Sequence, residues 1–243
     1  MSTVPSPEYD QALLQIVSAA RVGTIAEAIT MMKSIDALLP ENDGLKWFNR
    51  MYQMVTEDVN ATPPGGAWQN PGWLARLDVV FAGFYFDAVA DYLVGRTVAA
   101  SWSALFEARF TPCIDRIQFA LAGMNAHINH DLALALLRTD TELNVVPAHN
   151  GPEHSDYESV NVILDSLMPS VLNMLATDAL GYAAQDTGKI GRILAYWNIC
   201  RARDLAWDFA DHLRGFSGIA YDGALAMQDS LTGALGRAIL AQV

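Results

Sequence analysis

The stretch FALAGMNAHINHDLALAL, residues 119–136, is apolar on nearly every side of a helix and carries a group of polar residues in its middle. A helix that is hydrophobic all round normally lies inside a protein core. A membrane span would need about 18 to 20 uninterrupted apolar residues, and the polar positions interrupt this stretch. They are Asn125, His127, Asn129, His130 and Asp131. The stretch therefore predicts a buried helix whose polar side chains need partners.

Two further long apolar segments have the same character. Residues 79–94 are interrupted by Asp87 and Asp91, and residues 160–184 are interrupted by Pro169 and other breaks. Alternation with a period of two residues, which marks a half-buried strand, is essentially absent. We therefore predict an all-α fold, a single-domain helical bundle of roughly eight or nine helices over residues 1–243, with residues 1–40 adding peripheral helices.

Capping residues suggest where the helices begin and end. Asn70 followed by Pro71, and Thr111 followed by Pro112, are typical starts of long helices, and Ser101 can cap a short one. The expected helices cover residues 5–22, 24–39, 44–59, 71–92, 101–108, 112–138, 187–214 and 221–243, with another from residue 156 that is kinked or broken at Pro169. Irregular segments are expected at residues 62–66 and 139–155.

The composition favours a globular protein with an acidic surface. Of the 243 residues, 52% are hydrophobic and 17% are charged, and the net charge is -12. This charge repels phosphate backbones, so we expect no nucleic-acid partner. No segment qualifies as a membrane span. The two cysteines form no CxxC pair and residues 1–11 lack a secretory pattern, so we expect a cytoplasmic protein. A homo-oligomer is left open.

His127 and Asp131 are the first candidates for chemistry. A spacing of four residues places both on one helix face, with His130 beside them. A carboxylate next to a histidine can hold it in one tautomer and raise its pKa, which suits a general base. The same pair can instead be a satisfied buried contact that ties neighbouring helices together. Both interpretations stay open from the sequence.

A second group of candidates lies on the helix expected over residues 71–92. Asp78 and Tyr85 are seven residues apart on one face, so both can look into the same cavity. Arg203 falls in a largely apolar stretch, where an unpaired guanidinium would be costly. The candidate catalytic residues are therefore His127, Asp131, Arg203, Asp78 and Tyr85. The competing interpretation is an internal salt bridge from Arg76 or Arg203 to a buried aspartate.

A metal site is a further hypothesis. Asp208 and His212 again stand four residues apart, and two helices that each present a histidine and a carboxylate are similar to helical di-iron or zinc sites. The candidate metal ligands are His127, Asp131, His154, Asp208 and His212. The cofactor would be none, or a single or dinuclear iron or zinc site. Neither Glu-x-x-His nor HExxH is present, and Asp208 with His212 can equally be a solvated helix edge.

Several common catalytic motifs are absent from the sequence. It contains no GxSxG elbow, no GxxxxGK[ST] loop and no DDxxD helix. It does contain enough aromatic residues to line an apolar pocket. These are Trp47, Phe48, Tyr52, Phe81, Phe84, Tyr85 and Phe86.

Five stretches of the chain together resemble a bacterial family. They are GLKWFNRMYQMVT from residue 44, ARLDVVFAGFYFDA from 75, FALAGMNAHINHDLALAL from 119, HSDYESVNVIL from 154 and ARDLAW from 202. The resemblance includes the pattern G-x-N-A-H-I-N-x-D-L, in which His127, Asn129 and Asp131 hold defined positions and His130 a variable one. The family resembled is an all-helical, uncharacterised one with a domain-of-unknown-function label. The resemblance implies a helical fold and supports this choice of site, and it implies no reaction.

We expect a cytoplasmic bacterial enzyme that acts on a mainly apolar small molecule in an internal helical pocket, with acid–base groups around His127 and Asp131. A tailoring or cyclisation step of secondary metabolism would suit such a pocket. One alternative is a metal-dependent oxygenase or hydrolase that uses iron or zinc. The other is a non-catalytic helical protein that binds a small molecule, in which the buried polar helix only fixes the packing.

Overall fold

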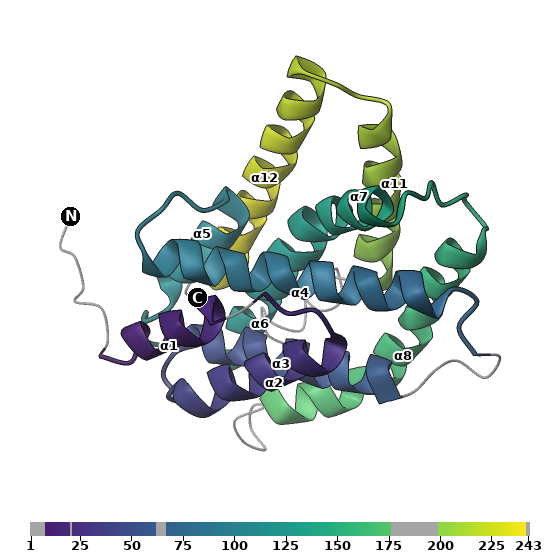
Figure 1. Cartoon of the computed structure of the whole chain (residues 1–243). Coiled ribbons are helices and arrows are strands. Elements are labelled where there is room, and N and C mark those ends of the chain that lie inside the picture. Colours follow the sequence, from purple (N-terminus) through teal and green to yellow (C-terminus); the bar gives the residue numbers. More distant parts are fainter. Residues whose placement is uncertain (1–7, 20, 62–66, 176–198, 242–243) are drawn as a thin grey trace.

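The apolar runs of the sequence form helices in the computed structural model, which describes residues 8–19, 21–61, 67–175 and 199–241 (Figure 1). The elements are α1 (Asp10–Ser18), α2 (Ile25–Leu38), α3 (Gly44–Ala61), α4 (Pro71–Leu93), α5 (Ala100–Ala108), α6 (Arg116–Ala126), the π-helix η1 (His127–Asp131), α7 (Leu132–Leu143), α8 (Pro152–Leu175), α11 (Ile199–Arg214) and α12 (Ile219–Leu240). These described ranges contain no strand, so the predicted all-α bundle is confirmed.

Local capping chemistry explains several helix starts. The Thr24 side chain accepts a hydrogen bond from the Glu27 N–H while the Glu27 carboxylate accepts one from the Thr24 N–H, which forms a capping box at the start of α2. Asn70 accepts a hydrogen bond from the Trp73 N–H, and Pro71 occupies the first turn of α4. Both starts agree with the sequence-based expectation within one residue.

Two predicted helix starts are wrong. The helix expected from Pro112 begins instead at Arg116, because Cys113 has a φ of 65°, a left-handed conformation that breaks a helix. Ser101 does not cap α5, whose N-cap is Ala99. The carboxylate of Asp229 in α12 takes that role, since it accepts the free N–H groups of Ala100 and Ser101.

The irregular segment expected over residues 139–155 is shorter than predicted. Helix α7 continues to Leu143 and ends at Asn144, whose φ of 52° stops it in the left-handed conformation. Helix α8 already starts at Pro152 and contains Pro169. The loop expected at residues 62–66, and the part of the expected helix over residues 187–198, lie outside the described residues.

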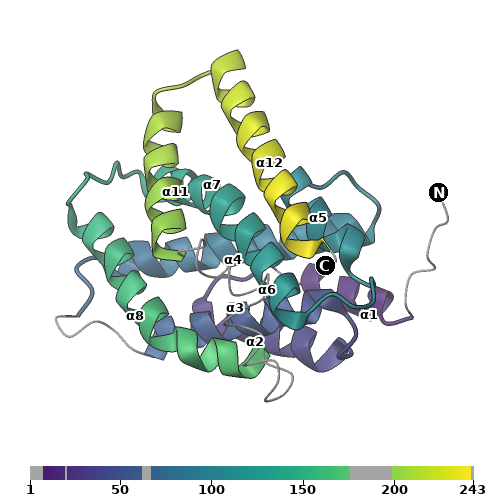
Figure 2. The same cartoon turned by 180° about the vertical axis from the view of Figure 1, so that it is seen from behind.

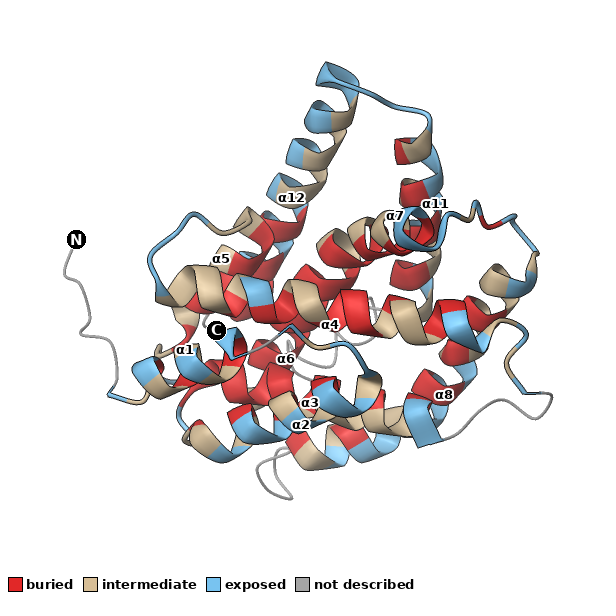
Figure 3. Ribbon diagram, viewed as in Figure 1, coloured by how far each residue is buried: buried red, intermediate tan, exposed pale blue. Residues whose placement is uncertain are grey.

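Helix α4 runs across the middle of the molecule, with α1, α2 and α3 on one side and α7, α11 and α12 on the other (Figures 1 and 2). Helix α12 packs on α5 and α6, and α11 packs on α7. Figure 3 shows that the buried residues concentrate where α3, α4 and α6 meet. This arrangement brings the polar middle of the 119–136 stretch to the centre of the core.

Large side chains fill this core. Trp47, Trp73 and Trp102 are at most 2% exposed. Helices from the first 40 residues also reach it, since Leu13 of α1 and Met32 of α2 are fully buried. None of the helices within the described residues combines the length and the apolar character that crossing a membrane requires.

Candidate functional site

The turn His127–Asp131 is a π-helix between two α-helices. The Leu132 N–H donates its hydrogen bond to the His127 carbonyl, five residues earlier. The sequence predicts one continuous α-helix here, because a π turn leaves no distinct pattern in a nearly all-apolar stretch. Single π turns inside α-helices occur frequently at functional sites, and this one contains both residues of the candidate pair.

Three donors converge on the carboxylate of Asp131. His127 Nδ1 lies 3.0 Å from Oδ2, and the indole Nε1–H of Trp102 donates to the same oxygen at 2.9 Å. His130 Nδ1 lies 2.8 Å from Oδ1. An ionised carboxylate only accepts hydrogen bonds, so both histidines present N–H at Nδ1. The predicted contact between His127 and Asp131 is therefore formed, and His130 joins it.

Aromatic rings enclose the His127 imidazole, which is 0% exposed. The ring stacks on Phe81, with 3.5 Å between centroids and 5° between planes, and it meets the Tyr52 ring edge-on at 4.6 Å. Phe48 packs against it at 5.7 Å. The second ring nitrogen, Nε2, is buried and has no hydrogen-bond partner among the described residues. A buried polar atom without a hydrogen-bond partner lowers the stability of the folded protein, and a functional role is one reason why such an atom is kept.

Burial and hydrogen bonding set the charges of this group. Burial lowers the pKa of His127, although the hydrogen bond and the charge of Asp131 oppose the shift. Burial would raise the pKa of Asp131, but its hydrogen bonds from both histidines outweigh it and lower the pKa. For His130, burial is outweighed by Asp131 and Asp229, which raise its pKa. The group therefore favours the neutral form of His127 and the ionised form of Asp131, and it stabilises the protonated form of His130.

The neighbouring residues of the same stretch hold the π turn in place. A Cβ atom at Gly123 would lie 2.3 Å from the Phe48 ring, so only glycine lets that ring approach. The Asn125 amide donates to the Thr232 carbonyl of α12, and the Asn129 amide donates to the Asn125 side-chain oxygen. The two asparagines thus serve packing, and the histidines and Asp131 are left as the chemical group.

Tyr85 and Asp78 are the candidate residues on α4. The Tyr85 hydroxyl donates to Asn49 at 3.2 Å, and its ring lies 6.3 Å from the His127 ring. Asp78 is half-buried, and burial raises the pKa of its carboxyl to about 7 even though Arg203 opposes the shift. Tyr52 meets the His127 ring from α3, and burial, together with the charges of Asp78 and Asp131, raises the pKa of its hydroxyl.

Arg203 does not reach His127 or Asp131. Its guanidinium donates to the Asn161 side chain at 2.8 Å and to the Tyr157 carbonyl at 2.7 Å, and it stacks over the Tyr157 ring. These contacts join α11 to α8 and satisfy the buried cation. Arg76 forms an ion pair with Glu142, so neither arginine forms the predicted salt bridge to a buried aspartate.

The structure does not bring the five candidate metal ligands together at one site. Among these five described residues, only His127 and Asp131 are in side-chain contact. Asp208 and His212 are exposed on α11, and His212 Nδ1 donates to the Asp208 carbonyl. His154 packs on Trp207 and His149 instead of on His127. Within the described residues, no group of three or more histidine, cysteine or acidic side chains could hold a metal ion.

Trp102 and Tyr52 are the residues that sequence reasoning missed or left undefined. Trp102 was not singled out, although a buried indole N–H usually needs a partner. Tyr52 was only one of several aromatics that could line a pocket. Neither spacing nor composition can place these side chains against residue 127 or 131, because they come from α5 and α3.

The fold and the site define an all-helical protein with a buried His–Asp pair on a π turn. The chain belongs to the family described as "Family of unknown function (DUF5995)", whose model matches residues 25–242. The resemblance to a helical family of unknown function is thus confirmed. Comparisons with curated proteins and with solved structures gave no significant match.

Proposed function

We propose that the protein is an enzyme that uses His127 as a general base on a mainly apolar small molecule. The observation that carries this proposal is the bare Nε2 atom of a buried, neutral histidine whose Nδ1–H is held by Asp131. A histidine oriented in this way by a carboxylate presents a lone pair at the other nitrogen, which is the arrangement of a general base.

The proton balance follows from the hydrogen bonds. Nε2 accepts a proton from an acidic C–H or O–H group of the substrate and His127 becomes an imidazolium. Asp131 stabilises that cation through the Nδ1 hydrogen bond, while Trp102 and His130 keep the carboxylate oriented. The imidazolium then gives its proton to the product, which restores neutral His127, and Asp78, with a pKa of about 7, is a further acid–base group on α4.

The surroundings of Nε2 support an apolar substrate. Phe48, Tyr52 and Phe81 enclose the imidazole, and a polar ligand without partners there would be penalised by several kcal/mol (about 2 to 7). Because the ring is fully covered, substrate entry requires one of these aromatic side chains to move. A tailoring or cyclisation reaction of bacterial secondary metabolism fits this chemistry, and we place the reaction in the cytoplasm.

The test is conversion of apolar metabolites by the purified full chain. Fractions of an apolar bacterial extract are incubated with wild type, His127→Gln and Asp131→Asn, and mass spectrometry follows substrates and products. We expect at least one compound to be converted by wild type and not by the His127 variant. The matched control is His149→Gln, which changes an exposed loop histidine and should retain activity. Equal conversion by wild type and the folded His127 variant would contradict the proposal.

One observation favours a second candidate, a non-catalytic helical binding protein. The close stacking of His127 on Phe81, together with its lack of exposure, is also what a purely structural contact between α4 and η1 would show. In that case a compound retained by the protein would be recovered chemically unchanged from every variant. His127→Gln would then lower stability without changing any reaction.

A further inference from the structure

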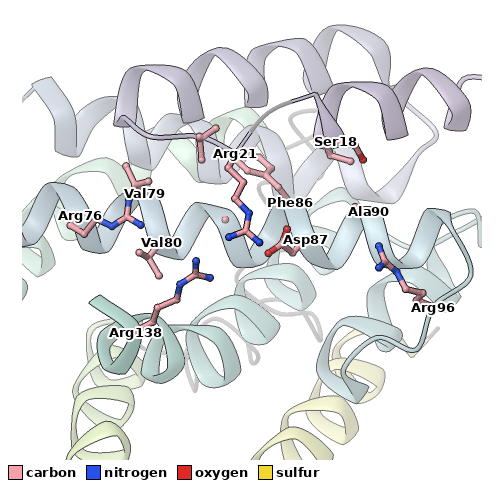
Figure 4. Close-up of a pocket in the computed structure, with 13 residues that line it drawn as sticks. Ser18, Arg21, Arg76, Val79, Val80, Phe86, Asp87, Ala90, Arg96 and Arg138 are labelled. Atoms are coloured by element: carbon pink, nitrogen blue, oxygen red, sulfur yellow. The ribbon is translucent and has the colours of Figure 1, made fainter. Parts of the chain in front are cut away.

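A pocket of about 310 Å³ lies between α1, α4 and the middle of α7 (Figure 4). It is separate from the His127 site, because helical spacing puts its wall residues on the other face of α4. Phe81 and Tyr85 contact the His127 ring, whereas Arg76, Gly83 and Asp87 line the pocket. A ligand in this pocket is therefore independent of the function proposed for His127.

The pocket combines apolar walls with guanidinium groups. Val79, Val80 and Phe86 of α4 and Val17 and Val22 near α1 supply the apolar surface. Four arginines also line it, namely Arg21, Arg76, Arg96 and Arg138. In Figure 4 the side chains of Arg21 and Arg138 reach toward one another from opposite sides of the cavity.

Carboxylates neutralise only part of this charge. Glu142 accepts hydrogen bonds from both Arg76 and Arg138, and Asp91 forms an ion pair with Arg96. Asp87 is the acidic residue of the lining itself. Arg21 forms no ion pair with any described residue. Three carboxylates therefore face four guanidinium groups, which leaves a positive pocket in a protein whose net charge is -12.

We propose that this pocket binds a small amphipathic anion, an organic carboxylate or phosphate monoester with a short apolar tail. Arginine presents a fork of N–H donors that matches both kinds of oxyanion, and Arg21 is available to use it. The valines and Phe86 provide a surface for the tail. The volume lies near the lower end of ligand sites, which are about 300 to 1,000 Å³, so the tail is short.

The ligand test is isothermal titration calorimetry on the full chain with octyl phosphate, octanoate, octylamine and inorganic phosphate. We expect both octyl anions to bind, and octylamine, which has the same tail and a cationic head, to bind at least about tenfold more weakly. Tighter binding of octyl phosphate would assign a phosphate head, and tighter binding of octanoate a carboxylate. Failure of both octyl anions to bind at about 1 mM, or equal binding of octylamine, would overturn the proposal.

Two variants and one control locate the binding. Arg21→Gln removes an exposed guanidinium that holds no ion pair with the described residues, and we expect about a tenfold loss of affinity. Arg237→Gln makes the same charge change at an ion pair on α12 and should leave affinity unchanged. Gly83→Leu should fill the pocket, since a Cβ there meets nothing within 4 Å, and should abolish binding while the melting curve shows a folded protein. Equal losses in both arginine variants, or unchanged binding by folded Gly83→Leu, would refute the site.

Discussion

At the scale of single residues, the hydrogen bonds to Asp131 decide which nitrogen of His127 carries a proton. The carboxylate accepts from Nδ1, and burial lowers the pKa of the ring, so Nε2 is bare at neutral pH. We predict that nitrogen-15 NMR of the labelled protein shows His127 as the neutral Nδ1–H tautomer from about pH 8 to below about pH 6.5, the ordinary histidine pKa. His130, whose pKa is raised, should still be protonated above that pH.

Asp131→Asn is the informative comparison for this tautomer. An amide can donate as well as accept, so the variant should lose the fixed tautomer of His127 and the raised pKa of His130. A wild-type spectrum with the proton on Nε2 of His127 would contradict the proposed function, because Nε2 could then not act as the general base.

Asp78 should make stability depend on pH. The pKa of its carboxyl is about 7 in the folded protein because of burial, against an ordinary value of 3.8. Between these values the folded protein keeps a proton that the unfolded chain releases, so the free energy of unfolding falls as the pH rises. We predict that Asp78→Asn removes this decline, and that its stability relative to wild type therefore increases from about pH 4 to about pH 7.

Urea denaturation at several pH values measures this difference. Asp87→Asn is the control, since it removes an exposed carboxylate from the opposite face of the same helix. A stability difference between Asp78→Asn and wild type that stays constant over this pH range would show that the Asp78 carboxyl titrates normally.

At the scale of secondary-structure elements, glycine decides how closely α6 approaches α3. Adding a methyl group at Gly123 would put Cβ 2.3 Å from Phe48, whose ring is fully buried and also contacts His127. We predict that Gly123→Ala lowers the free energy of unfolding by about 1 to 3 kcal/mol, as overpacking in a core does. Gly83→Ala is the matched control, because its Cβ meets open space. It should raise stability by about 0.5 to 1 kcal/mol through helix propensity.

Chemical denaturation of both alanine variants checks this pair of predictions. A neutral Gly123→Ala would mean that the Phe48 ring can move aside freely, and the aromatic enclosure of His127 would then be loose.

The elements also show how far a sequence can predict a structure. The starts of α2 and α4 were predictable because the capping residues lie within three positions of the groups they satisfy. The start of α6 was not, because the left-handed Cys113 interrupts a stretch with an ordinary capping pattern. Likewise, the pairing of His127 with Asp131 followed from a spacing of four, whereas the π geometry of that turn carries no sequence signal.

At the scale of the whole molecule, the contacts between residues far apart in the chain could not be predicted from the sequence. Trp102 meets Asp131 and Tyr85 meets Asn49 across different helices, so no local pattern encodes either contact. The same holds for the arginine pocket, whose residues come from three parts of the chain that only the fold brings together. The sequence identified the polar centre of the core, and the tertiary structure defined its partners.

The assembly of the first helices onto the bundle depends on one buried cation. Arg109, at the end of α5 and fully buried, donates to Asp43 before α3 and to Asp10 of α1, both at less than 3 Å. Removing the arginine leaves a completely buried Asp43 carboxylate without its counter-ion. We predict that Arg109→Ala lowers the free energy of unfolding by about 3 to 5 kcal/mol, as loss of one partner from a buried ion pair does.

The matched control for Arg109→Ala is Arg237→Ala, which breaks an exposed ion pair with Glu107 and should cost no more than about 1 kcal/mol. Amide hydrogen exchange then shows where the loss acts. Protection in α1 and at the start of α3 should fall first, because Asp10 and Asp43 are the groups that lose their partner. Equal destabilisation by the two variants, or a loss of protection confined to α12, would show that the N-terminal helices are held by apolar packing alone.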